Sequence, residues 1–184
     1  MCLRPAAALL LAASILACSA PPEKERHQAE GALAAARAAG AATYAPDEIG
    51  AAERSLAAYD DAVARRDYRQ ALSLAIDARD GAYEAARRAA DGRAIAQAGA
   101  ERLILEAEGL LREIETRLAS SPSSRGTPTD AGRWQTLHDS GTRALQEARS
   151  LVGNREFPAA QARVAPVVED LRAALNPAAG AERR

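Results

Sequence analysis

Cysteine, histidine and aromatic residues are scarce in this chain of 184 residues, which has two cysteines, two histidines and 3% aromatic residues. Two cysteines cannot form a disulfide framework. The histidines show no HExxH or paired spacing and the cysteines no CxxC, so no zinc site is expected. Phosphate loops, dinucleotide fingerprints and nucleophile elbows are also missing from the sequence. We therefore predict no metal, no cofactor and no enzymatic activity.

An excess of charge of either sign is missing as well, since 24 basic residues stand against 25 acidic ones. A nucleic-acid partner, which requires a basic surface, is therefore not expected. No stretch alternates apolar and polar residues as a half-buried strand does. What is abundant is alanine, the best helix former, which adds little volume to a core. The predicted fold is all-α, an elongated antiparallel helical bundle with closely packed helices.

The longest apolar run is short and lies near the N-terminus, from Ala6 to Leu16. About 11 residues are too few to span a bilayer, which needs roughly 20, but they suit the apolar region of a signal peptide whose short N-terminal region contains Arg4. The run ends in Ile15-Leu16-Ala17-Cys18, which resembles a bacterial lipobox. We predict a lipoprotein signal peptide of residues 1–17, cleavage before Cys18, and lipidation of the Cys18 thiol.

An ordinary signal peptide, cut after Ala17 or Ala20 and leaving a free thiol, is the alternative. The lipoprotein interpretation is favoured because a polar, proline-containing segment follows at once, as a tether of residues 18–27 would. A single cysteine in an exported chain needs an explanation, and attachment of several acyl chains provides one. Ser19 after the cysteine is not the aspartate that retains lipoproteins in the inner membrane. The expected location is the periplasmic face of the outer membrane.

Five helices are predicted from the spacing of apolar residues, prolines and small polar clusters. Pro46 and Pro128 each suit a first helical position. No proline interrupts the third helix, whose packed face is expected to include Tyr68, Leu72 and Tyr83. The first helix is predicted from Glu23 to Ala42, and the second begins at Pro46 and ends before a corner at residues 65–68. The third is predicted from Tyr68 to Ala119. After the loop, Pro128 can open the fourth helix, which ends near Gly153-Asn154, and the last helix runs from about Phe157 to Asn176. The predicted organisation is an N-terminal helical unit of residues 28–119, a loop at 120–129, a C-terminal hairpin at 130–176 and a disordered tail at 177–184.

A weak internal repeat relates the second and third helices to the last two, at a constant offset of 89 residues. Asp67-Tyr68 corresponds to Glu156-Phe157, so each predicted corner has an acid followed by an aromatic residue. A further match of Ala29-Glu30 to Ala100-Glu101 would extend the repeat to three helices. The chain would then be two three-helix units, 23–91 and 94–176, that share the long middle helix. Chance similarity between alanine-rich helices is the other explanation.

The stretch ATYAPDEIGAAERSLAAYDDAVARRDYRQALSLAIDARDGAYEAARRA resembles an uncharacterised family of alanine-rich bacterial envelope domains. These domains are often lipoproteins and often precede an OmpA-like peptidoglycan-binding domain. The resemblance covers residues 29–95. It rests on Tyr44-Ala45-Pro46, Glu48 and the corner Arg66-Asp67-Tyr68 with Ala71, Leu74 and Ala75 after it. Peptidoglycan binding is not carried over, because this chain has no OmpA-like domain.

Few other side chains suggest chemistry. His138, next to Asp139, is interpreted as a solvated or capping residue on a helix flank, in preference to a metal ligand. Trp134, the single tryptophan, is either core filler or an anchor in a protein interface, where tryptophan often dominates binding. The leading functional hypothesis is a membrane-anchored, non-enzymatic helical scaffold or adaptor with an envelope protein as partner. The alternative is a module that binds a small or lipidic ligand in a groove between helices.

Overall fold

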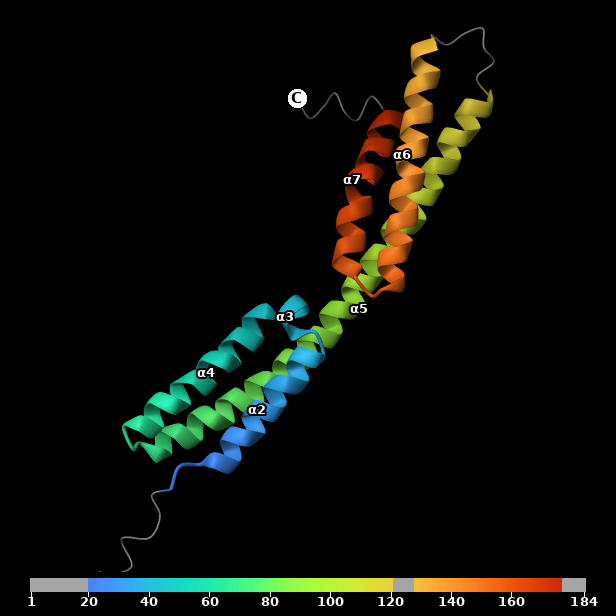
Figure 1. Cartoon of the computed structure of the whole chain (residues 1–184). Helices are drawn as coiled ribbons and strands as arrows, with labels where there is room; N and C mark the ends of the chain where they lie inside the picture. Colours follow the sequence, from blue (N-terminus) through green and yellow to red (C-terminus); the bar gives the residue numbers. More distant parts are fainter. Residues whose placement is uncertain (1–19, 121–127, 177–184) are drawn as a thin grey trace, which may run out of the picture. The chain divides into compact units, whose positions relative to one another are not determined.

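The computed structural model describes residues 20–120 and 128–176, and these residues form six helices and no strand (Figure 1). The predicted all-α fold is thus confirmed for this part of the chain. The helices are α2 (Glu23–Ala38), α3 (Ala41–Tyr44), α4 (Pro46–Ala64), α5 (Tyr68–Ser120), α6 (Pro128–Gly153) and α7 (Phe157–Leu175). Pro46 and Pro128 open their helices as predicted, and the long third helix of the sequence analysis is α5.

The chain divides into two compact units, Met1–Gly92 and Arg93–Arg184, here called unit 1 and unit 2. The boundary lies inside α5, so the predicted N-terminal unit of residues 28–119 extends too far. The reason is the core of unit 2, in which Ile104, Leu111 and Ile114 of α5 pack with residues of α6 and α7. The second part of α5 therefore belongs with the C-terminal hairpin, as in the three-helix version of the repeat.

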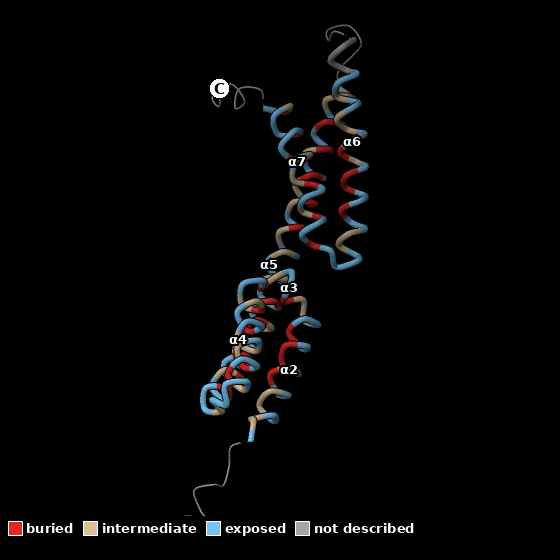
Figure 2. The backbone as a smooth tube through the Cα atoms, turned by 60° about the vertical axis from the view of Figure 1, so that its left-hand side comes forward, coloured by how far each residue is buried: buried red, intermediate tan, exposed pale blue. Residues whose placement is uncertain are grey.

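Unit 1 has a core made mainly of alanine. Figure 2 shows the buried residues as stripes along the helices. On α5 the stripe advances in steps of three and four residues, which keeps it on one helical face. The few large buried side chains of unit 1 are Leu33, Ile49 and Tyr59. The fully buried alanines on this part of α5 are Ala71, Ala75, Ala78, Ala82, Ala85 and Ala89.

This alanine seam corrects two predictions about α5. Leu72 is 38% exposed and Tyr83 is 59% exposed, although both were placed on the packed face. Each lies one residue beyond a seam alanine, Ala71 and Ala82. Alanines occupy the face of α5 that packs against other helices because their short side chains let two helix backbones approach closely. Dispersion contacts then form along the whole row of alanines. The large side chains then remain outside it.

A second correction concerns the first helix, which was predicted to run to Ala42. Helix α2 ends at Ala38, and Gly40 follows with a φ of 90°. This left-handed conformation, which glycine adopts without steric cost, separates α2 from the short helix α3. The predicted tether of residues 18–27 likewise overlaps α2, which begins at Glu23.

The corner between α4 and α5 and the corner between α6 and α7 have the same hydrogen-bond pattern, at the predicted offset of 89 residues. In unit 1 the Arg66 amide donates to the Val63 carbonyl and the Asp67 amide to the Ala62 carbonyl, both at 2.9 Å. In unit 2 the amides of Arg155 and Glu156 donate to Val152 and Leu151, at 3.0 and 2.9 Å. This pair of bonds is the Schellman motif, which satisfies the last free carbonyls of a helix.

Burial also agrees with the weaker match between α2 and the second part of α5. Ala29 and Ala100 are both 0% exposed, and the next core positions are Leu33 in α2 and Ile104 in α5. At this offset of 71 residues, Ala36 corresponds to Ala107, and both are fully buried. Each unit is therefore a three-helix arrangement with corresponding core positions, and α5 contributes a different part of its length to each.

Ion pairs between helices fix how the helices align along one another. Alanine seams are smooth and specify helix register weakly, whereas opposite charges reward one alignment and penalise others. In unit 1, Arg37 Nη2 lies 2.7 Å from Glu53 Oε1, between α2 and α4. In unit 2 all three helix pairs have such a contact: Arg149 with Glu108, Arg163 with Glu147, and Arg172 with Glu106.

Candidate functional site

The predicted lipidation site, Cys18, lies outside the described residues, as does the predicted signal peptide of residues 1–17. The described chain begins with Ala20, three residues before α2. No helix among residues 20–120 and 128–176 has the length and apolar character needed to cross a membrane.

The exposed large apolar side chains of the described residues all lie on α5. Leu72 and Tyr83 belong to unit 1, and Ile95 and Leu105 belong to unit 2, where they are 73% and 67% exposed. Leu72 and Tyr83 are 11 residues apart, which returns a helix to nearly the same direction, so both share one face. Single exposed apolar residues are common. Here, however, every exposed large apolar side chain among the described residues lies on the single helix α5.

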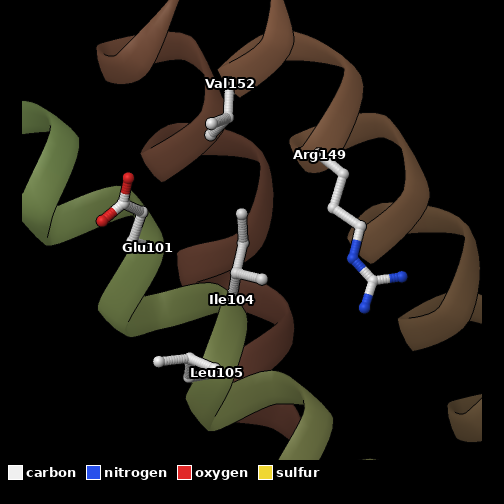
Figure 3. Close-up of a pocket in the computed structure, with 5 residues that line it drawn as sticks. All are labelled: Glu101, Ile104, Leu105, Arg149 and Val152. Carbon is white, nitrogen blue, oxygen red and sulfur yellow. The ribbon is translucent and has the colours of Figure 1, made fainter.

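A hollow of about 370 Å³ lies between α5 and α6 in unit 2. In Figure 3, Ile104 of α5 and Val152 of α6 point toward one another across it, and Leu105 lies at its edge. The Arg149 guanidinium points away from the hollow and lies 2.6 Å from Glu108. Glu101, the remaining lining residue, accepts a hydrogen bond of 2.8 Å from the Gln97 amide. The hollow is therefore apolar, and its two charged lining residues have polar partners.

A second hollow, of about 420 Å³, also has Val152 in its lining and lies at the corner between α6 and α7. It is more polar. Its charged lining residues are both arginines, Arg93 and Arg155, and Gln97 and Phe157 also line it. Arg155 has no side-chain hydrogen bond or ion pair among the residues that the structure describes. Val152 lines both hollows, so they adjoin; the pair, apolar at one end and cationic at the other, is called the groove below.

Trp134, the predicted interface candidate, lies on α6 and is partly buried against the core of unit 2. The guanidinium carbon of Arg117 lies 5.6 Å from the centre of its ring, a cation–π distance. These contacts give Trp134 a packing role within unit 2.

His138 is less exposed than a solvated flank residue, because its Nε2 lies 2.9 Å from Glu115 Oε1 on α5. Its side chain is 23% exposed. The hydrogen bond to Glu115 raises the pKa of His138 above its ordinary value, against the opposing effect of burial, and Asp139 raises it further. His138 therefore joins α5 and α6 through a contact that is an ion pair when its imidazole is protonated. No cluster of three or more potential metal ligands occurs among the described residues.

The groove was not found by the sequence analysis, which proposed a groove in general terms but named none of its residues. Its apolar residues look like ordinary core positions in the sequence, and its arginines like ordinary surface residues. No protein-family model, curated protein sequence or solved structure matches this chain. The resemblance to alanine-rich envelope domains therefore remains a prediction.

Proposed function

We propose that this chain is a bacterial lipoprotein, anchored by lipid on Cys18 to the periplasmic face of the outer membrane, that acts as a non-enzymatic helical adaptor. The lipobox Ile15-Leu16-Ala17-Cys18 and the polar segment after it support the anchor. The adaptor role is supported by the exposed apolar side chains of α5, of which Tyr83 is one of the largest. Aromatic side chains of this kind are enriched at protein interfaces.

The anchor is tested by replacing Cys18. We expect the Cys18→Ala variant to be lost from the membrane fraction of cells, because no acyl chains can then be attached. The matched control is Cys2→Ala, which removes the other cysteine but leaves the lipobox intact. Metabolic labelling with a radioactive or clickable fatty acid should mark the wild type and Cys2→Ala, but not Cys18→Ala. Labelling of Cys18→Ala would disprove the anchor.

The adaptor role is tested by photo-crosslinking in cells. A photoreactive amino acid at position 83 on α5 should capture a discrete envelope protein, identified by mass spectrometry. The same residue at position 57, an exposed alanine of α4 in the same unit, is the control. Capture of one protein at position 83 but not at position 57 supports the adaptor. Equal capture at both positions, or none at position 83, contradicts it.

A second candidate function, binding of a small or lipidic ligand, is favoured by one observation. The groove of unit 2 combines an apolar end and a cationic end, and each hollow lies within the range of roughly 300–1,000 Å³ typical of small-molecule sites.

A further inference from the structure

We propose that the groove between α5 and α6 of unit 2 binds a long-chain fatty acid, with its carboxylate paired to Arg155 beside the cationic Arg93 and its alkyl chain along Ile104, Leu105 and Val152. This inference rests on the second candidate function above, for which it names the ligand, and is independent of the adaptor role, which concerns the exposed apolar side chains of α5 as a docking surface for protein. It rests on the chemistry of the groove, and on a comparison of unit 2 with the corresponding part of unit 1.

The two ends of the groove are suited to the two parts of such a ligand. Arginine pairs well with a carboxylate, since its planar guanidinium can donate two parallel hydrogen bonds. Arg155 has no partner among the described residues that would compete for it. Arg93 and Leu105 lie 12 residues apart on α5, or about 18 Å along the helix axis. This length suits an extended alkyl chain, and the apolar end would remove part of it from water.

The two acidic groups beside the apolar end of the groove have donors of their own. Glu101 lies two helical turns from Arg93 and accepts a hydrogen bond from Gln97. Glu108 pairs with Arg149 at 2.6 Å. The negative charges therefore lie at the apolar end and have donors of their own, whereas the charged lining residues of the corner hollow are cationic.

In unit 1, side chains close the position that corresponds to the groove between α5 and α6. The counterparts of Gln97 and Arg149, at the offsets of 71 and 89 residues, are Arg26 and Asp60. Their side chains meet between α2 and α4, with Arg26 Nε 3.6 Å from Asp60 Oδ1. The ring of Tyr59 lies against the same arginine, 5.9 Å from its guanidinium carbon.

Unit 2 lacks this closing contact. Gln97 turns along its own helix to Glu101, and Arg149 turns to Glu108. The residue in the position of Tyr59 is the small, buried Ala148, which cannot fill the gap as a tyrosine ring does. Arg93 corresponds to Pro22 in unit 1, so this positive charge is particular to unit 2, whereas Arg155 has a counterpart in Arg66.

The test uses the purified full-length chain, kept in solution by an amphipathic polymer, and palmitic acid with a photoreactive diazirine in its alkyl chain. After irradiation, mass spectrometry should find the label on the segment around Val152 and on the facing segment of α5. The methyl ester of the same probe has no carboxylate, so we expect it to label these segments about tenfold more weakly, as loss of a charge-assisted hydrogen bond implies.

Three variants make the test specific. Arg155→Gln should weaken labelling about tenfold, whereas the matched control Arg66→Gln, at the equivalent corner of unit 1, should leave it unchanged. The double variant Gln97→Arg with Arg149→Asp recreates the closing pair of unit 1 and should abolish labelling, with the helical circular dichroism signal retained. Undiminished labelling of Arg155→Gln or of a folded double variant would overturn the proposal, as would equal labelling by the methyl ester.

Discussion

Arg66 and Arg155 have almost the same unusual backbone conformation, with φ values of 60° and 64°, at equivalent points of two corners 89 residues apart. Both occupy the position after the helix end at which the Schellman motif requires a left-handed residue, most often glycine. For any residue with a Cβ atom this conformation costs roughly 1–2 kcal/mol. The repeat thus includes a strained arginine as well as a hydrogen-bond pattern.

Relief of this strain should stabilise the protein. We expect Arg66→Gly to raise the free energy of unfolding by about 0.5–1 kcal/mol, the strain relief being partly offset by the greater entropy of glycine in the unfolded chain. Urea denaturation followed by circular dichroism measures the change. The neighbouring Arg65 has a φ of −83°, so Arg65→Gly should give no gain. Equal effects of the two substitutions would show that the corner is not strained.

Two glycines in unit 2 should respond to alanine in opposite directions. A Cβ at Gly141 would lie 2.7 Å from Cδ2 of the buried Leu111, whereas one at Gly109 would meet nothing within 4 Å. We expect Gly141→Ala to cost about 1–3 kcal/mol through overpacking. Gly109→Ala should gain about 0.5–1 kcal/mol, because alanine is the better helix former. Chemical denaturation of both variants distinguishes packing from helix propensity; a gain from Gly141→Ala would contradict the packing described here.

The contact between His138 and Glu115 should make stability depend on pH. The pKa of His138 is raised in the folded chain, so its contribution is fully present below the ordinary value of 6.5 and is lost as pH rises through the folded-state pKa. Since Glu115 is 58% exposed, solvent screening limits the effect to a few tenths of a kcal/mol.

The measurement compares the free energy of unfolding at pH 5.5 and pH 8.5 in the wild type and in His138→Gln. The wild type should lose stability over this interval relative to the variant. All other side chains are common to both proteins, so the difference between them isolates His138. A pH dependence that is the same in the two proteins would rule out a contribution from this pair.

Tyr59 offers a test of the unit 1 core. Its side chain is 1% exposed, and its hydroxyl has no hydrogen-bond partner among the described residues. Burial raises the pKa of this hydroxyl, so it remains neutral and bears the cost of lost hydration. Tyr59→Phe should therefore preserve stability or raise it by about 1 kcal/mol. Tyr59→Ala should cost about 3–5 kcal/mol, because it leaves a cavity. Thermal and urea unfolding of both variants check this, and a large loss in Tyr59→Phe would reveal a polar role.

Much of the helical architecture follows from local sequence signals. Pro46 and Pro128 mark helix starts, and Gly153 the end of α6, through backbone geometry alone. The break at Gly40 could not be predicted in this way, since a single glycine in an alanine-rich helix costs only about 1 kcal/mol. Tertiary packing of α2, α3 and α4 decides that α2 ends there.

The packed face of α5 was misjudged for a related reason. Hydrophobic patterns give most weight to residues such as Leu72 and Tyr83, whereas close approach of helices favours the alanines beside them. The groove exists because Gln97 hydrogen-bonds to Glu101 and Arg149 pairs with Glu108, so these two side chains do not meet across the groove. Each arginine or glutamine on a helix can reach several acidic residues, and the sequence alone does not show which of them it pairs with.

The alanine seam of unit 1 also determines which substitutions the protein can accept during evolution. In most cores the largest side chains are the least replaceable, and small positions accommodate change. Along Ala71, Ala75 and Ala82, which are fully buried, any replacement except glycine adds atoms where two backbones already lie close together. A deep mutational scan for folding stability should therefore find the largest losses at the smallest side chains of α5, and wide tolerance at its exposed Leu72.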